Sequence, residues 1–417
     1  MLNITDINHL AAELLSSGET HCDKTHLPCT IKPLLEIINN ESCYDNHSQV
    51  SFLPYSRLNS AEELAACRGV MERVSATGQF AGGDFIIQLE KLLEAFYQAT
   101  ACVATCSGTD ALKIALMSIG VGAGDEIIVP PNSFAATENA IFSVGAKPVY
   151  ANIDDSFNIN PDDIARLVTD KTKAILAVCL YGSMRNIREI KDQARHHELR
   201  VIVDASQCFG MPEMLHYCDV ITLSFNPCKN IGGFGKAGAL LTSSSEIAKN
   251  ARQFSYHGFA ESEKNVKVQN WGFNSRMDNM QASLLMTKFD FFEINALKRS
   301  FLAHRYLELL KPLDEAHHII LPIETIENAW YLFPIRINDG KRDELIRYAK
   351  IMNIEFNMYY PILGYDGINN YAQHYRDKIH FTITSNIHAS VLQIPLHNHM
   401  SIEEQDKVIA VIFAFFK

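Results

Sequence analysis

Lys229 is the residue in this sequence whose setting first suggests chemistry. It lies in the segment Ser224–Asn230, which reads SFNPCKN and follows the apolar run DVITL. That run is typical of a short β-strand, so we expect the lysine on a loop just beyond the strand end. A lysine there can form an imine with an aldehyde if desolvation or a nearby cation lowers its pKa. The alternative is an ordinary solvated lysine, and this segment alone does not decide between them.

A carboxylate ends a second apolar run. Asp204 is the last residue of the strand-like stretch in VIVDASQ. A carboxylate at the end of a buried strand is costly unless it has a partner. The ring nitrogen of a pyridine-type cofactor is one such partner, because an acid opposite it keeps the ring an electron sink.

Two further segments fit the same chemistry. SGTDAL places Ser107, Gly108 and Thr109 at the expected start of a helix, where free N–H groups and the helix dipole suit a phosphate. The alternative is a plain Ser/Thr cap. Phe134 follows the run EIIVP and is placed to stack on a ring, although most Phe side chains belong to the core. The specific signal is the joint order of phosphate-binding cap, aromatic residue, strand-end Asp and strand-end Lys.

The elements that must position these residues alternate between strand and helix. Seven short β-rich runs lie between residues 102 and about 245, with helical segments such as PDDIARLV and NIREIKDQARHH between some of them. This alternation predicts an α/β fold, a mainly parallel seven-stranded sheet with helices on both faces. Ligands of such sheets bind at the carboxyl ends of the strands.

The rest of the chain predicts further units. Residues 1–50 are expected to form an extension of two short helices, 51–300 the large domain, and 301–417 a smaller α+β domain. A helical region is expected from about 276 to 312. Ser60 and Glu63 have the spacing of a capping box at the start of a helix.

Composition narrows the class of function. Of the 417 residues, 47% are hydrophobic and 20% charged, which is ordinary for a globular protein. The net charge is -11 and no long basic run appears, so we expect no nucleic-acid partner. Ten scattered cysteines are typical of reduced thiols, and no apolar run is long enough for a membrane span, so we expect a cytoplasmic protein.

Several motifs occur together in an order that identifies a family. The chain resembles the sugar aminotransferases of the DegT/DnrJ/EryC/StrS family from about residue 50 to its C-terminus, through the motifs SGTDAL, GDEIIVPPNSFAAT, GAKPVYANID, VCLYG, VIVDASQ, SFNPCKN and GFNSRMDNMQA. The resemblance implies an aspartate-aminotransferase-like fold (fold type I of enzymes dependent on pyridoxal 5′-phosphate). It also implies a homodimer with active sites shared between the subunits.

The resemblance assigns roles to individual residues. Lys229 is the implied Schiff-base lysine and proton carrier, and Asp204 is implied to face the pyridine nitrogen. The other implied cofactor contacts are Phe134 stacking on the ring, Gln207 near the ring hydroxyl, Ser107, Gly108, Thr109 and Ser224 at the phosphate, and Asn274 from the neighbouring subunit. Sugar dehydratases of this fold have a His in place of the lysine, so Lys229 favours transamination.

A narrower set of motifs indicates the substrate. FLPYSRL, ATGQFAGG, QFSYHGF and YYPIL are similar to family members that aminate 3-oxo-glucose 6-phosphate. These members also have an N-terminal extension, and they imply glutamate as the amino donor and kanosamine 6-phosphate as the product. The alternatives are a nucleotide-linked keto sugar as substrate, or a catalytically idle binding or regulatory subunit.

The sequence also departs from the family. Where the family usually has GDGGA, this chain has Gly235-Lys236-Ala237-Gly238, and Arg185 follows VCLYG where the family is often uncharged. We therefore consider Lys236, Arg185 and His257 as contacts for a substrate phosphate, with ordinary surface cations as the alternative. The string GxGxxG at Gly233–Gly238 lies between a loop and a strand, the wrong context for a dinucleotide. No metal site is expected, because the His and Cys residues lack ligand spacing.

Overall fold

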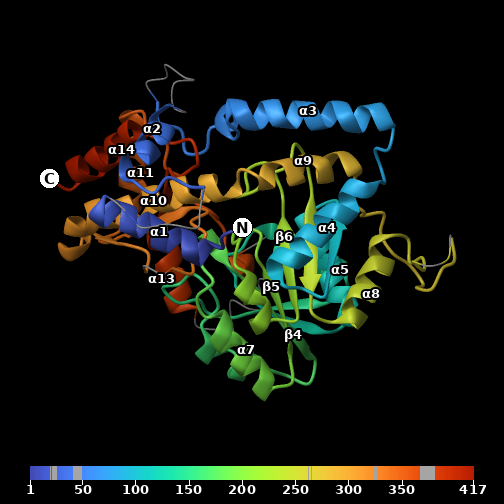
Figure 1. Ribbon diagram of the computed structural model, residues 1–417. Helices are drawn as coiled ribbons and strands as arrows, with labels where there is room; N and C mark the ends of the chain where they lie inside the picture. Colours follow the sequence, from blue (N-terminus) through green and yellow to red (C-terminus); the bar gives the residue numbers. More distant parts are fainter. Residues whose placement is uncertain are drawn as a thin grey trace.

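A computed structural model describes residues 1–18, 20, 26–40, 49–261, 263, 265–323, 326–366 and 381–417. Its main feature is a seven-stranded sheet with strand order β1-β7-β6-β5-β4-β2-β3. Strands β4, β5 and β6 of this sheet are labelled in Figure 1. The strands are β1 (Ala101–Thr105), β2 (Glu126–Val129), β3 (Lys147–Tyr150), β4 (Thr172–Val178), β5 (Arg200–Asp204), β6 (Val220–Ser224) and β7 (Gly238–Thr242).

The strand directions match the mainly parallel sheet expected from the sequence. Strands β3, β2, β4, β5 and β6 pair in parallel, and β7 lies antiparallel between β6 and β1. Since β4, β5 and β6 point the same way, their last residues Val178, Asp204 and Ser224 reach one edge of the sheet. The predicted α/β fold class is confirmed.

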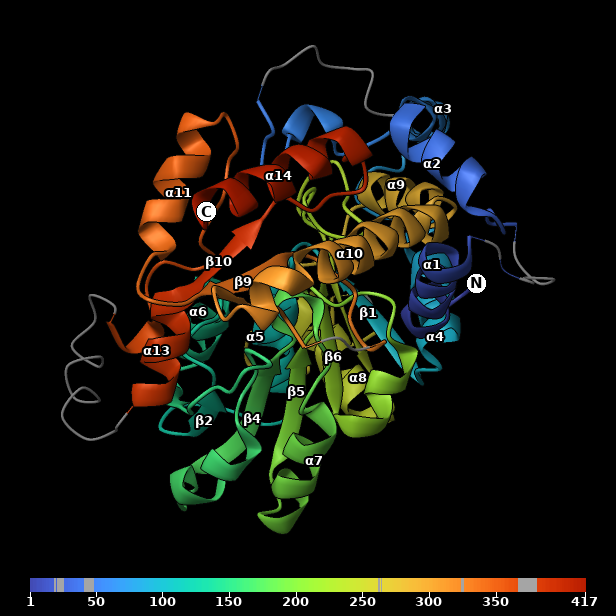
Figure 2. The same ribbon diagram turned by 90° about the vertical axis from the view of Figure 1, so that its left-hand side faces the viewer.

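Helices cover both faces because side chains alternate along each strand. In β5, Val201 and Val203 join one core, while Ile202 joins the other. The first core packs against α4 (Asp84–Tyr97), α7 (Ile187–His196), α9 (Asn279–Phe289) and α10 (Phe292–Glu315), and the second against α5 (Gly108–Ser118), α6 (Ala135–Ser143) and α8 (Ser245–Ser255). Figure 2 shows these helices around the sheet.

A second, three-stranded sheet lies in the C-terminal part. Its order is β10-β9-β8, all antiparallel, and its own core includes Trp330 and Phe333. Its elements are β8 (Ile319–Ile320), β9 (Phe333–Ile337), α11 (Arg342–Ile351), α13 (Thr382–Ser390), β10 (Val391–Ile394) and α14 (Ile402–Phe415). The mixture of strands and helices agrees with the predicted α+β character. The proposed boundary at residue 300 falls inside α10, so the domain limits stay a prediction.

The N-terminal residues pack on other parts of the chain. Helix α1 (Ile4–Ser17) lies along α10, and α2 (Ile31–Asn40) contacts α14. Buried Asn8 donates to the carbonyls of Ile326 and Asn328 at 2.7 and 2.9 Å. The extension is thus tied by specific bonds to the segment that connects β8 and β9.

Two local expectations can be compared with the structure. Helix α3 (Ala61–Thr77) begins with the predicted capping box between Ser60 and Glu63. The helical region predicted from 276 to 312 is instead two helices, α9 and α10, which are separated at Asp290–Phe291. In the described part of the chain, every helix is too short or too polar to cross a bilayer.

Candidate active site

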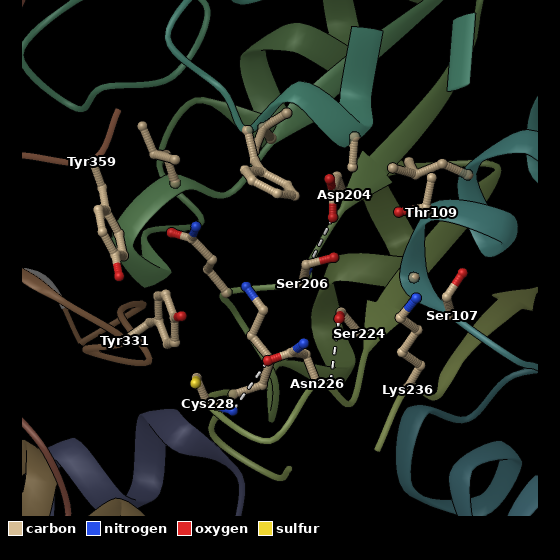
Figure 3. Close-up of a pocket in the computed structure, with 18 of the residues that line it drawn as sticks. Ser107, Thr109, Asp204, Ser206, Ser224, Asn226, Cys228, Lys236, Tyr331 and Tyr359 are labelled. Carbon is tan, nitrogen blue, oxygen red and sulfur yellow. Dashed lines mark hydrogen bonds between the residues drawn. The ribbon is translucent and has the colours of Figure 1, made fainter. Parts of the chain in front are cut away.

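A cavity of about 390 Å³ lies at the carboxyl ends of β4, β5 and β6 (Figure 3). A volume of this size is ordinary for a small-molecule site. Eight residues predicted as cofactor contacts line this cavity: Ser107, Gly108, Thr109, Phe134, Asp204, Gln207, Ser224 and Lys229. The sheet therefore brings together side chains from segments more than 100 residues apart.

Lys229 lies on the turn that follows β6. Its backbone N–H donates to the Asn226 carbonyl at 2.8 Å, and its Nζ lies 4.5 Å from the centre of the Tyr331 ring. Burial lowers the pKa of Lys229 to about 8, although Asp204 and Cys228 act in the opposite direction. An amine with this pKa is partly neutral near neutral pH, which a nucleophile or general base requires.

Asp204 is 6% exposed at the end of β5. Burial raises the pKa of its carboxyl group, and hydrogen bonds from Ser206 and the charge of Lys229 only partly offset this rise. One carboxylate oxygen accepts from the Ser206 N–H at 3.0 Å. A buried acid on the wall of a cavity is suited to a cationic N–H group of a ligand.

The start of helix α5 forms another wall of the cavity. Ser107 is the N-cap, and its Oγ accepts from the Asp110 N–H at 3.1 Å. The backbone approaches its neighbours closely here: a Cβ on Gly108 would lie 2.7 Å from Ser224 Cβ, and one on Gly238 would lie 2.4 Å from the Ser107 carbonyl carbon. The glycines therefore allow strand ends and helix start to meet, leaving N–H groups of the first turn for an anion.

Phe134 and Gln207 are two further predicted cofactor contacts that line the cavity. Phe134 precedes α6, is 56% exposed, and its ring centre lies 5.3 Å from that of Tyr360. Gln207 is buried; its Oε1 accepts from the Tyr181 N–H at 2.7 Å and its Nε2 donates to the Tyr360 hydroxyl at 3.1 Å. The first bond fixes the orientation of the amide, so its NH₂ group faces Tyr360 and the cavity.

The remaining predicted residues lie in different places. Lys236 lines the cavity next to the Ser107–Thr109 turn. Arg185 does not line this cavity; it borders a separate small hollow with Phe157. His257 and Asn274 are exposed on the segment between α8 and α9, also outside the cavity. The three proposed substrate cations thus do not form one cluster within a single chain.

One wall of the cavity is aromatic, and the sequence motifs did not predict it. Tyr55, Tyr331, Tyr359 and Tyr360 line the cavity together with Cys228. Tyr359 and Tyr360 stack with ring centres 5.2 Å apart, and Tyr359 N–H donates to Gln393 Oε1 at 2.6 Å. The motif YYPIL contained these tyrosines, but no local pattern indicates that a distant strand, β10, would hold them over Lys229.

The fold and this site define a class of protein. The chain matches the DegT/DnrJ/EryC1/StrS aminotransferase family over residues 60–413, and it belongs to that family. The family prediction is confirmed, and with it the expectation of an aminotransferase.

Among curated proteins, the chain is 39% identical to the 3-oxo-glucose-6-phosphate:glutamate aminotransferase of Bacillus subtilis (strain 168), covering 89% of this chain and 84% of that protein. It is 31% identical to the UDP-2-acetamido-2-deoxy-3-oxo-D-glucuronate aminotransferase of Pseudomonas aeruginosa, covering 79% and 90%. Among solved structures, NtdA from Bacillus subtilis, which carries the bound cofactor PMP, has a TM-score of 0.91 and 35% identity, covering 99% of this chain and 98% of that one.

Proposed function

We propose that this chain transfers an amino group from glutamate to 3-oxo-glucose 6-phosphate, giving kanosamine 6-phosphate and 2-oxoglutarate, with pyridoxal 5′-phosphate as cofactor. The observation that carries the proposal is the meeting of Lys229, Asp204 and the start of α5 around one cavity. Each supplies a different requirement of that cofactor: an amine for its aldehyde, an acid for its ring nitrogen, and donors for its phosphate.

The residues present fit this cofactor. The raised pKa of Asp204 indicates a carboxylate whose burial is only partly compensated by the protein, which a pyridinium N–H would correct. Lys229 would hold the aldehyde, Phe134 would stack on the ring, and Gln207 would lie near the ring hydroxyl. Ser107, Gly108, Thr109 and Ser224 would hold the phosphate. When bound, the cofactor acts as an electron sink for negative charge at the carbon that carries the amino group.

The chain's own residues then perform the proton chemistry. With its amine free, Lys229 has a pKa of about 8, so part of it is an uncharged base near neutral pH. It is positioned to take the proton from the substrate carbon and to return it one position along. Asp204 would keep the ring nitrogen of the bound cofactor protonated, because its carboxylate is a buried negative charge. Tyr331, which is 5% exposed, covers Lys229 on this side of the cavity.

A sugar monophosphate is supported as the substrate by the similarity of the whole chain. The relative that acts on 3-oxo-glucose 6-phosphate is 39% identical, whereas relatives named for UDP- or dTDP-linked sugars are 27–32% identical. NtdA also covers 99% of this chain, which includes the N-terminal helices.

We also propose that two copies form a homodimer with shared active sites. Ile87 and Tyr256 line a common hollow outside the active-site cavity, and the nearby residues Phe80 and Trp271 are 50% and 49% exposed. Exposed apolar surface of this kind is typical of a protein interface. Asn274 forms a bridge with Tyr256 and lies outside its own cavity, so its proposed contact with the cofactor phosphate requires the neighbouring subunit.

Buried cysteines support a cytoplasmic location. Cys67, Cys102, Cys179, Cys208 and Cys218 are buried thiols in the core, which is usual in a reducing compartment.

The test is the near-visible absorption spectrum of the purified protein with pyridoxal 5′-phosphate. We expect a cofactor band that falls when glutamate is added and returns only with 3-oxo-glucose 6-phosphate. If the band instead returns with a nucleotide-linked keto sugar, the proposed substrate is wrong but the proposed transamination stands. If no band forms even with added cofactor, the proposal fails and a binding or regulatory role takes its place.

A further inference from the structure

Lys236 occupies a position that the strand register fixes. Strand β7 lies between β1 and β6, and its first residue, Gly238, pairs with Thr105 on one side and Ser224 on the other. The Ala237 carbonyl accepts from the Phe225 N–H at 2.8 Å. Lys236 therefore lies just before the point where three strand ends meet, beside the turn that leads into α5.

The segment before Lys236 is held by a side chain from α9. Gln281 Oε1 accepts from the Phe234 N–H at 3.1 Å. A Cβ on Gly233 would lie 2.7 Å from the same oxygen, and one on Gly235 would lie 3.0 Å from Gln281 Nε2. The backbone is therefore packed tightly up to Lys236, and its side chain lines the cavity.

Lys236 is an exposed side chain on the wall of the cavity that also contains Asp204. Among the residues that the structure describes, no carboxylate forms an ion pair with it. The nearest acid in the first turn of α5, Asp110, is bound to Lys113 at 3.0 Å and to Ser275 at 3.0 Å. A lysine at a helix N-terminus is unfavourable by itself, because the helix end carries a partial positive charge. A multiply charged anion between Lys236 and the start of α5 would make this arrangement favourable.

The cofactor and the sugar substrate of the proposed reaction both carry a phosphate. The geometry of the cavity indicates which of these two phosphates Lys236 contacts. In Figure 3, Lys236 points toward Ser107 and Thr109 on one side of the cavity, while Tyr331 and Tyr359 lie on the other side. The reactive Nζ of Lys229 lies 4.5 Å from the Tyr331 ring centre, so the amino transfer belongs to the tyrosine side. Lys236 therefore lies on the side of the cavity where the first turn of α5 offers N–H groups to an anion, and away from the tyrosine side.

We infer that Lys236 is a binding residue for the phosphate group of the cofactor. The inference rests on the proposed function, and it replaces a substrate contact as the role of this lysine. A lysine at this position would give the phosphate a full positive charge in addition to the N–H and hydroxyl donors. Hydrogen bonds to charged groups correspond to about 10- to 100-fold in affinity.

The experiment compares pyridoxal 5′-phosphate with pyridoxal, which lacks the phosphate. The dissociation constant of each is measured by absorbance titration of the cofactor-free protein, for the natural chain and for Lys236→Ala. We expect Lys236→Ala to weaken the binding of pyridoxal 5′-phosphate by about 10- to 100-fold and to leave the binding of pyridoxal unchanged. Lys236→Arg should restore most of the loss. Lys173→Ala, which removes an exposed lysine on β4 outside the cavity, is the matched control and should change neither constant.

A second measurement does not require attachment to Lys229. Inorganic phosphate should raise the melting temperature of the cofactor-free protein, and this rise should shrink in Lys236→Ala but not in Lys173→Ala.

The inference is overturned if Lys236→Ala weakens the binding of pyridoxal 5′-phosphate and of pyridoxal equally, or changes neither dissociation constant. It is also overturned if only the KM for the sugar phosphate rises, because Lys236 would then contact the substrate. Failure of the natural chain to bind pyridoxal 5′-phosphate would refute the proposed function itself, which separates the two failures.

Discussion

The two ends of the active-site cavity are built in different ways. The phosphate end consists of backbone and short side chains at strand ends, such as Ser107, Gly108 and Ser224, whose positions follow from the register of neighbouring strands. The tyrosine end consists of large side chains from distant segments: Tyr55, Tyr331, Tyr359 and Tyr360. These tyrosines come from the segment before α3 and from the part of the chain that forms the small sheet.

We expect the phosphate end to determine the affinity for the cofactor and the tyrosine end to affect the rate of turnover. In the proposed function, the phosphate end holds a group that does not react, so its residues contribute binding energy that is equal in the ground and transition states. The tyrosine end lies at Lys229, whose protonation state changes in the proposed reaction. Substitutions at the two ends should therefore affect different measured quantities, and the following experiments test this division.

The largest effect is expected for Lys229→Ala. Turnover should fall by more than about 10³-fold, because proton transfer alone contributes roughly 10²–10⁴-fold and the covalent role is lost as well. The phosphate end is untouched, so the variant should still bind pyridoxal 5′-phosphate non-covalently. The checks are multiple-turnover assays and equilibrium dialysis. Substantial multiple turnover in this variant would contradict the assignment of Lys229.

The next largest effect is expected for Asp204→Asn, which should lower the reaction rate but raise the stability of the cofactor-free protein. The rate should fall by about 10²- to 10³-fold, as for loss of one preorganised electrostatic contact. The cofactor-free protein should become more stable at neutral pH, by about 1–3 kcal/mol, because a buried carboxylate is replaced by a neutral amide.

The pH dependence of this stability follows from the sign of the shift. Because the folded-state pKa of Asp204 is raised, its contribution is intact below the unfolded value of about 4 and is lost as the pH rises through the folded value. Urea unfolding of the two proteins should therefore diverge with rising pH. Asp219→Asn is the control with the opposite sign. Burial would raise the pKa of Asp219, but bonds from Val201, Arg200 and Lys191 hold it below its usual value, so this variant should lose stability at neutral pH.

Gly108→Ala should affect affinity more than rate. The added Cβ would lie 2.7 Å from Ser224 Cβ, so helix α5 or the end of β6 must shift. We expect about 1–3 kcal/mol lower stability and at least about 10-fold weaker binding of pyridoxal 5′-phosphate. Urea unfolding and cofactor titration measure both. Gly122→Ala is the control, since its Cβ meets nothing within 4 Å. A changed kcat with unchanged cofactor affinity would break the division between the two ends.

The smallest effect concerns the contact between Lys229 and Tyr331. With a lysine pKa of about 8, the rate of attachment to pyridoxal 5′-phosphate should rise about 10-fold between pH 7 and 9 and then level off. The Tyr331 ring stabilises the ammonium form, by about 0.5–1 kcal/mol in a partly open site. Tyr331→Leu should therefore move the profile to lower pH by about half a unit, while Tyr331→Phe should not. A rate still rising at pH 10 would show that burial does not lower this pKa.

Most of the fold could be predicted from the sequence. The seven β-rich runs correspond to the seven strands, and the capping box at Ser60 has the predicted partner. Local periodicity and turn residues carry this information. The break at Asp290–Phe291 was not predicted, because apolar residues continue on both sides of it. The two helices pack on different neighbours, α9 on α3 and α4 and α10 on α1, and these contacts are not visible in the local sequence.

For the site, the strand-end residues were predictable and the aromatic wall was not. Parallel strands place their last residues at one edge of the sheet, so the sequence pattern is enough to assign Asp204, Ser224 and Lys229 to a shared site. Which end of the cavity Lys236 faces depends on β7 lying between β1 and β6, and strand order does not follow from local sequence.

The sequence by itself determined the residue types that do the chemistry and the strand ends that present them, because these depend on short-range pattern and on the common geometry of parallel sheets. The tertiary structure alone decided the pKa of Lys229, the tyrosines around it and the role open to Lys236. Those properties arise from burial and from contacts between residues about 100 or more positions apart, such as Lys229 with Tyr331 and Gly238 with Thr105. Burial and long-range contact are properties of the packed chain, and no local segment carries them.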